Sequence, residues 1–141
     1  MKIRKATKKD LKELAELFLE ESSKKPYFQG YTLKTARDRV NDMLANGTIY
    51  PITINKKIVG FIAIAAEGKK DIYIDEFWIN KKSQGKGFGK SLLKFIEDKY
   101  KKKGTKTISV MTSKNAGAFK FYKKLKYKVN DKQVILTKKL K

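Results

Sequence analysis

The amino-acid sequence predicts a single domain of the α/β class. The chain has 141 residues, the length of one ordinary domain, and 40% of them are hydrophobic, which is enough to fill a core. Segments with the apolar spacing of amphipathic helices alternate along the chain with short β-prone runs. Because no internal repeat or linker interrupts this order, we expect one domain over residues 1–141, with helices packed on a sheet.

The expected helices have recognisable starts and ends. Thr7 is a good N-cap, and Asp10 three residues later gives a pattern close to a capping box. Thr32 can cap a second helix, which the Asn46-Gly47 pair would stop. Apolar residues recur at helical spacing after each of these starts and in two later segments. The expected helices are 8–21, the segment between Thr32 and Gly47, 87–102 and 116–125.

The expected strands are short and rich in β-branched and aromatic residues. The run 58–66 is almost continuously apolar, which is typical of a strand buried on both faces. It has nine residues, far too few for a membrane helix, and the charged N-terminus lacks the apolar core of a signal peptide, so we expect no membrane partner. The expected strands are 3–6, 49–54, 58–66, 71–79, 107–111, 127–129 and 133–137.

The composition excludes several kinds of chemistry. The chain has no cysteine, so disulfides, thiolate nucleophiles, zinc–thiolate sites and iron–sulfur clusters are ruled out. It also has no histidine, the usual general base and the commonest metal ligand. We therefore expect no metal, and catalysis would depend on carboxylates, tyrosine, lysine, hydroxyls, backbone dipoles or a bound cofactor. The absence of cysteine fits the cytoplasm, which is the expected location.

The charge is strongly positive and unevenly distributed. The net charge is +21, of which residues 81–141 carry +17 and residues 1–80 only +4. Such a field attracts an anion, either nucleic acid or a phosphorylated cofactor. Of the 35 basic residues 32 are lysines, whereas proteins that read bases favour arginine, so specific nucleic-acid binding is not expected. Host codon bias or solubility would account for the lysines equally well.

A glycine-rich turn lies between the strand 71–79 and the helix 87–102. It reads Gln84-Gly85-Lys86-Gly87-Phe88-Gly89, with Lys90 following. Glycines let the backbone approach a ligand, and the free N–H groups at a helix start point toward an anion. The spacing matches neither the dinucleotide-binding fingerprint nor the P-loop. The alternative interpretation is a flexible turn with a helix cap and no ligand.

A second motif follows about 30 residues later. It reads Asn115-Ala116-Gly117-Ala118-Phe119-Lys120-Phe121-Tyr122, and it ends with Lys126-Tyr127. With the glycine turn and the strand before it, this block resembles the GNAT family, the GCN5-related N-acetyltransferases, over nearly the whole chain. Two positions depart from the family pattern: Lys126 replaces a usual glycine, and the segment 80–83 lacks a common proline.

The resemblance implies a fold and a co-substrate. The fold is a mixed, mostly antiparallel sheet with helices on both faces, splayed between its fourth and fifth strands. Acetyl-CoA would bind in the gap as co-substrate. Its pyrophosphate would lie on the turn from Gln84 to Lys90, namely Gln84, Gly85, Lys86, Gly87, Phe88, Gly89 and Lys90. Its pantetheine arm would pair with the backbone of Phe77, Trp78 and Ile79 and contact Asn115, and Tyr122 would lie near the sulfur.

Without cysteine, an acyl-enzyme on a thiol is impossible, so direct attack of an amine in a ternary complex is expected. Tyr122 is the candidate general acid, since a phenol has a pKa near ~10, although a buried core aromatic is the alternative. Asp75 and Glu76 are candidate bases in an acidic run that also holds Glu67 and Asp71. Strand alternation would put Asp75 and Glu76 on opposite faces, so at most one would face the acceptor. Family members often carry an acid at the position of Asp75, which ranks it first; a surface ion pair with lysine is the alternative.

Two further hypotheses stay open: a basic nucleic-acid-binding domain, and a family member that binds CoA without catalysis. The acceptor would be a small amine, a polyamine, an antibiotic or a protein amine. The loop Ser22–Tyr31 would border it by resemblance, although core packing explains its aromatic residues equally well. Family members are often homodimers, and the residues leave the oligomeric state open.

Overall fold

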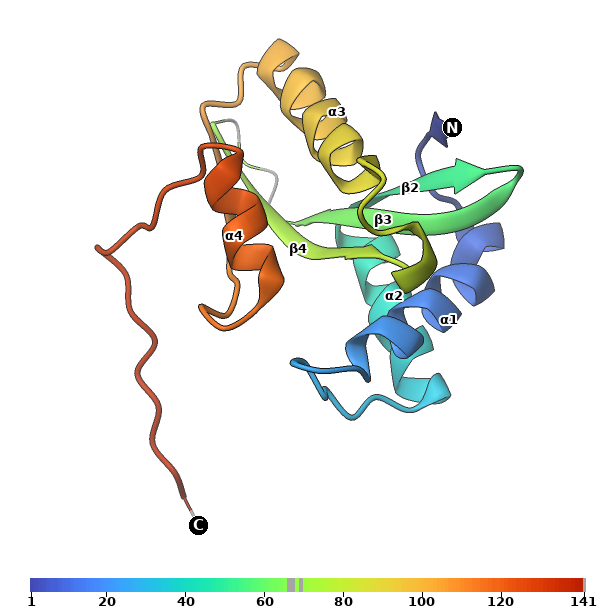
Figure 1. Ribbon diagram of the computed structural model, residues 1–141, viewed down its shortest axis with the longest axis horizontal. Helices are drawn as coiled ribbons and strands as arrows, with labels where there is room; N and C mark the ends of the chain where they lie inside the picture. Colours follow the sequence, from blue (N-terminus) through green and yellow to red (C-terminus); the bar gives the residue numbers. More distant parts are fainter. Residues whose placement is uncertain (66–67, 69, 141) are drawn as a thin grey trace. The chain divides into compact units, whose positions relative to one another are not determined.

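A computed structural model describes residues 1–65, 68 and 70–140 (Figure 1). It comprises two compact units, Met1–Met111 and Thr112–Lys141, which are described separately. The expectation of one domain over the whole chain stays a prediction. Among the described residues, no helix is both long enough and apolar enough to cross a membrane.

The first unit is built on a five-stranded sheet whose strand order is the order in the sequence. All neighbouring pairs are antiparallel except β4 and β5, which run parallel. This confirms the predicted mixed, mostly antiparallel sheet. The strands are β1 (Lys2–Ile3), β2 (Thr48–Ile54), β3 (Lys57–Ala65), β4 (Asp71–Ile79) and β5 (Thr107–Val110).

Helices cover both faces of this sheet, as predicted (Figure 1). Helices α1 and α2 pack together on one face, and α3 packs on the other. Thr7 and Asp10 form a reciprocal capping box before α1, although the first turn is a 3-10 helix, and Thr32 caps α2. The helices are η1 (Lys8–Asp10), α1 (Leu11–Ser22), α2 (Leu33–Asn46), η2 (Lys81–Ser83) and α3 (Phe88–Lys102).

The core of the first unit lies on both faces of the sheet. On the face of α1 and α2, Phe18, Val40, Phe61 and Trp78 belong to one buried cluster. On the face of α3, the ring of Tyr50 lies 5.6 Å from that of Phe95. The central strands are therefore covered twice, which explains the almost unbroken apolar run of β3.

Strand β4 is longer than its pairing with β5. The pairing begins at Asp71 and Thr107 and ends at Ile74 and Val110. Beyond Ile74, β4 continues to Ile79 and remains paired with β3. This confirms the splay that was expected between the fourth and fifth strands.

The second unit contains one helix, α4 (Gly117–Lys124), among its described residues. After α4 the backbone of Lys126 is left-handed, with φ of 73°, and the amide of Tyr127 donates to the carbonyl of Tyr122. Lys126 thus adopts at the helix end the conformation that glycine adopts most easily. The unusual lysine has not removed the helix stop.

The two strands predicted at 127–129 and 133–137 are wrong, because neither segment forms strand pairing in the described part of the chain. The apolar side chains of Val134, Ile135 and Leu136 are 75%, 70% and 90% exposed. High β-propensity describes how a side chain fits a sheet, and it forms a strand only where another strand offers hydrogen bonds. The second unit provides no such partner among its described residues.

Candidate active site

The glycine turn follows directly from the end of β4. Asn80 caps η2 by accepting a hydrogen bond from the amide of Ser83 at 3.0 Å, so the turn forms without the proline common in the family. The side-chain amide of Gln84 then donates to the carbonyl of Ile79 at 2.8 Å. These two bonds fix the path of the chain from the strand to the start of α3.

At two positions in this turn the backbone conformation favours glycine, the residue without a side chain. Gly85 and Gly87 have φ of 78° and 85°, in the left-handed region. Beyond the adjoining residues, a Cβ at either position would meet no described atom within 4 Å, so backbone geometry rather than crowding favours glycine.

The start of α3 presents N–H donors that the helix itself does not satisfy. Gly87 is the N-cap residue, no side chain caps the helix, and its first turn contains no acidic residue. The amide of Ser91 makes the first helical bond, to the carbonyl of Gly87. The amides before Ser91 therefore have no partner within the helix, and exposed Lys86 and Lys90 lie beside them. This arrangement can bind a phosphate or another small anion.

The second part of the site lies at a β-bulge in β4. Ala63 of β3 pairs with Glu76, and the next residue, Ile64, pairs with Ile74, so Asp75 is one extra residue. A bulge interrupts the alternation of side chains along a strand. The prediction that Asp75 and Glu76 lie on opposite faces is therefore wrong: both bind Arg39 of helix α2.

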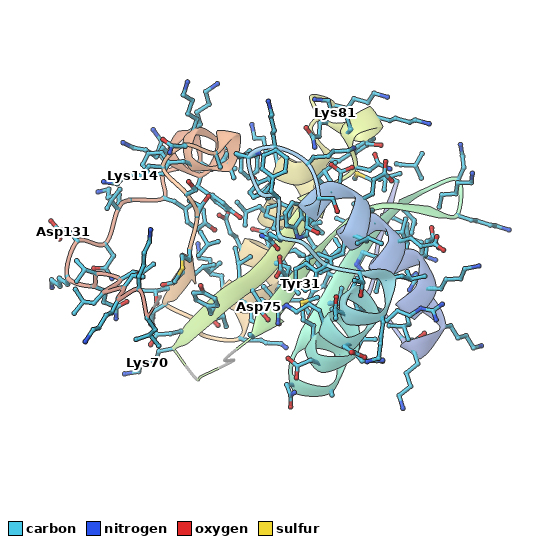
Figure 2. The ribbon with its side chains drawn as sticks, turned by 90° about the horizontal axis from the view of Figure 1, so that it is seen from below. Tyr31, Lys70, Asp75, Lys81, Lys114 and Asp131 are labelled. Carbon is cyan, nitrogen blue, oxygen red and sulfur yellow. The ribbon has the colours of Figure 1, made fainter. Side chains whose placement is uncertain are left out.

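Arg39 holds the two carboxylates through several bonds. Its Nη2 donates to Oδ1 of Asp75 at 2.7 Å and to Oε2 of Glu76 at 3.0 Å, and its Nε lies 3.3 Å from the same Glu76 oxygen. The other Glu76 oxygen accepts from the indole Nε1 of Trp78 at 2.8 Å. Figure 2 shows Asp75 on β4 beside α2. The predicted alternative was a surface ion pair with lysine. The structure instead has a partly buried ion pair with arginine.

Burial and these contacts alter the ionisation of the cluster. Burial raises the pKa of Glu76, and the hydrogen bonds from Trp78 and Arg39 partly oppose this rise. For Arg39, burial lowers the pKa, but the bonds to Asp75 and Glu76 outweigh it, so the pKa is raised. The guanidinium therefore stays charged, while the carboxyl of Glu76 takes up a proton more readily than an ordinary glutamate.

Aromatic residues of the loop after α1 pack on the same face. The ring of Tyr27 lies 4.8 Å from that of Trp78, and the ring of Tyr31 lies 4.7 Å from that of Phe18. Burial raises the pKa of Tyr27. These contacts favour core packing for both tyrosines, whereas Phe28 is exposed.

The other two acids in the predicted run are Asp71 and Glu67. Thr107 donates a hydrogen bond to Asp71, which joins the start of β4 to β5. Glu67 falls outside the described residues. Only Asp75 and Glu76 of this run are therefore seen together as candidate bases among the residues that the structure describes.

Asn115 and Tyr122 belong to the second unit. The side chain of Tyr122 is buried, with its ring 5.4 Å from the rings of Phe121 and Tyr127. The backbone amide of Asn115 donates to the hydroxyl of Ser113 at 3.2 Å. The predicted contacts of Asn115 and Tyr122 with acetyl-CoA stay predictions.

Arg39 was not recognised as a site residue from the sequence, although the rarity of arginine in this chain was a signal. In a chain with so many lysines, arginine occurs only at positions 4, 37 and 39. Arg4 makes two bonds of 2.9 Å to the carboxylate of Asp10, so two of the three use the fork geometry that lysine lacks. A rare arginine in a lysine-rich chain was therefore a pointer to a structured carboxylate partner.

The fold and the turn together define a class: an α/β protein with a helix start suited to phosphate beside a splayed pair of parallel strands. The family model described as the acetyltransferase (GNAT) family matches residues 11–127. The chain therefore belongs to the acetyltransferase (GNAT) family. A comparison with curated proteins gave no match.

Solved structures support the fold. A possible acetyltransferase from Clostridium difficile 630 is similar with a TM-score of 0.84 and 18% identity, covering 99% of this chain and 98% of the other. A ribosomal-protein-alanine N-acetyltransferase from Brucella melitensis biovar Abortus 2308 has a TM-score of 0.78 and 15% identity, with 97% of each chain covered. AAC(6')-Iy in complex with a CoA-containing bisubstrate analog has a TM-score of 0.75 and 15% identity, with 98% and 97% covered.

Proposed function

We propose that the protein is an N-acetyltransferase that moves an acetyl group from acetyl-CoA to a primary amine by direct attack in a ternary complex. The observation that carries the proposal is the turn between β4 and α3, where left-handed glycines, amides of a helix start without helical partners and lysines form an anion site. CoA is an anion with a pyrophosphate, and the neighbouring structure with a CoA-containing analog supports this choice.

The residues of this chain would divide the work between binding and proton transfer. The segment Gln84–Lys90 would bind the pyrophosphate, and the backbone of Phe77–Ile79, where β4 has passed the end of β5, would align the pantetheine arm. Acetyl-CoA supplies the activated acetyl group. Tyr122 is the proposed proton donor to the leaving thiolate, and a carboxylate of β4 is the proposed acceptor of the amine proton.

The charge distribution favours a cationic acceptor. Asp75 and Glu76 carry two negative charges against the single positive charge of Arg39, and Asp42 of α2 lies 3.8 Å from the same guanidinium. The cluster thus keeps an excess of negative charge within a strongly basic chain. A second ammonium on the acceptor would be attracted to it.

Acetyl-CoA should raise the melting temperature of the protein. A ligand that binds only the folded state at about a hundred times its Kd adds about 2.7 kcal/mol, which corresponds to several degrees in Tm. Thermal unfolding and titration calorimetry measure this directly. Stabilisation by duplex DNA that fades with salt, without any response to millimolar acetyl-CoA, would instead favour a nucleic-acid-binding domain.

Among acceptors of equal length, a linear diamine should give a kcat/KM about tenfold or more above that of the monoamine, and the ω-amino acid should be the poorest. Ten-fold corresponds to about 1.4 kcal/mol, the scale of one partly screened charge interaction. The assay follows CoA release. Equal values for the three acceptors would contradict the cationic preference, and binding of acetyl-CoA without turnover on any amine would indicate a non-catalytic member.

A further inference from the structure

The two carboxylates of the bulge are held differently. Both oxygens of Glu76 accept hydrogen bonds, one from Trp78 and one from Arg39, and its side chain is 13% exposed. Asp75 receives Arg39 on Oδ1, and its side chain is 25% exposed. Asp75 is therefore the more accessible carboxylate, while Glu76 is anchored from both sides.

This difference between the two carboxylates indicates a role for Arg39. Its side chain is 24% exposed, and the same Nη2 atom serves both carboxylates. On the basis of the proposed function, we propose that Arg39 is a positioning residue: anchored by Glu76, which Trp78 also binds, it holds Oδ1 of Asp75 and leaves Oδ2 toward the acceptor amine. In this arrangement Asp75 takes the amine proton, and Glu76 fixes Arg39.

The ionisation of Glu76 depends on the groups around it, which come from β4, from α2 and from the loop after α1. Asp75 and Trp78 lie on its own strand, Arg39 and Asp42 come from α2, and Tyr27 packs on the indole that binds it. Of the neighbours of Glu76, Arg39 and Trp78 favour its charged form, and Asp75 opposes it. Removal of Arg39 should therefore raise the pKa of Glu76.

The single tryptophan of the chain makes this measurable without turnover. Only one indole N–H resonance is expected, and its proton points at the carboxylate of Glu76. In wild type a pH titration of this resonance should follow the ionisation of Glu76, and Glu76→Gln should abolish the response. In Arg39→Met the midpoint should move upward by about one unit or more, the effect of losing an adjacent opposite charge.

Lys34→Met is the matched control. It removes one positive charge from the same helix, but Lys34 pairs with Asp38 at an exposed site, at 3.0 Å. Its indole titration should be that of wild type. If the midpoint of the indole titration shifts equally in Lys34→Met and Arg39→Met, the total charge of helix α2, rather than contact with Arg39, controls the ionisation of Glu76. That result would overturn the proposal.

A double-mutant cycle then tests the route through Asp75. Alone, Arg39→Met should lower kcat/KM for the amine about tenfold with acetyl-CoA affinity unchanged, and Arg39→Lys should recover part of the loss. In an Asp75→Asn background, assayed at the same pH as the single variants, Arg39→Met should change kcat/KM by less than about twofold.

The outcomes separate the two levels of inference. A tenfold loss on adding Arg39→Met to Asp75→Asn would show that Arg39 does not act through Asp75, and the positioning role would be wrong. If wild type transfers acetyl to no amine while the indole titration still depends on Arg39, the proposed function is wrong, and Arg39 is only a structural partner of Glu76.

Discussion

Gly87→Glu should abolish acetyl-CoA binding while the protein remains folded. The new carboxylate would stand at the N-cap of α3, next to the amides that are proposed to receive the pyrophosphate. A like charge placed against a bound anion costs several kcal/mol, or more than about a hundredfold in Kd. Folding should survive because the strain of a left-handed glutamate, about 1 to 2 kcal/mol, is partly offset by a favourable negative charge at the helix N-terminus. Apart from the adjoining residues, no described atom lies within 4 Å of the added Cβ. Titration calorimetry measures the affinity, and thermal unfolding checks the fold.

Gly104→Glu is the matched control at the other end of α3. Gly104 also has a left-handed backbone, with φ of 91°, and a Cβ added there would likewise have none of the described atoms beyond its chain neighbours within 4 Å. The substitution therefore brings the same charge and a comparable backbone strain, but away from the helix start. Its acetyl-CoA affinity should be close to that of wild type. Equal losses in both variants would mean that strain or net charge, rather than the turn, governs binding.

Tyr122→Phe should lower kcat about a hundredfold and leave acetyl-CoA affinity nearly unchanged. The phenol is the proposed donor to the departing thiolate, and loss of a general acid costs about 10² to 10⁴ in rate. The ring remains, so its packing against Phe121 and Tyr127 should be kept. Steady-state kinetics with a saturating acceptor measure the effect.

Tyr127→Phe serves as the control for this change. Its ring lies 5.4 Å from that of Tyr122 in the same unit, so it removes a similar hydroxyl from a neighbouring position. Its kcat should remain within about twofold of wild type. Full activity in Tyr122→Phe would assign this tyrosine to packing alone, and equal losses in both variants would point to a disturbed second unit.

Local signals predicted most of the helices and strands of the first unit. The caps at Thr7 and Thr32 and the turn before α3 are short-range features, and the structure has them where the sequence indicated. β4 was predicted at its observed bounds because its residues favour strands and turn residues flank it. The two C-terminal strands were wrong because pairing is a long-range property that propensity does not contain.

The orientation of Asp75 and Glu76 also depends on long-range contacts, which local sequence signals do not contain. Asp75 and Glu76 were found as candidates from their charge, but their orientation depends on the register between β3 and β4. No glycine or proline marks the bulge within Asp71–Ile79. Arg39 is thirty-six residues away from Asp75 along the chain, so only the packing of α2 on the sheet brings the two together.

The bulge at Asp75 also has a consequence for how this strand can evolve. Ile72 and Ile74 lie before the extra residue, and Trp78 lies after it on the opposite face, in the cluster under α1 and α2. In an unbroken strand, Ile74 and Trp78 would lie on the same face, because they are four residues apart. Deletion of Asp75 would therefore restore regular alternation and leave both side chains on the faces that they now occupy, while Arg39 would lose one of its two carboxylates. A change of length by one residue at this point alters the acidic pair without exchanging the two faces of β4, so the candidate site and the core can evolve separately.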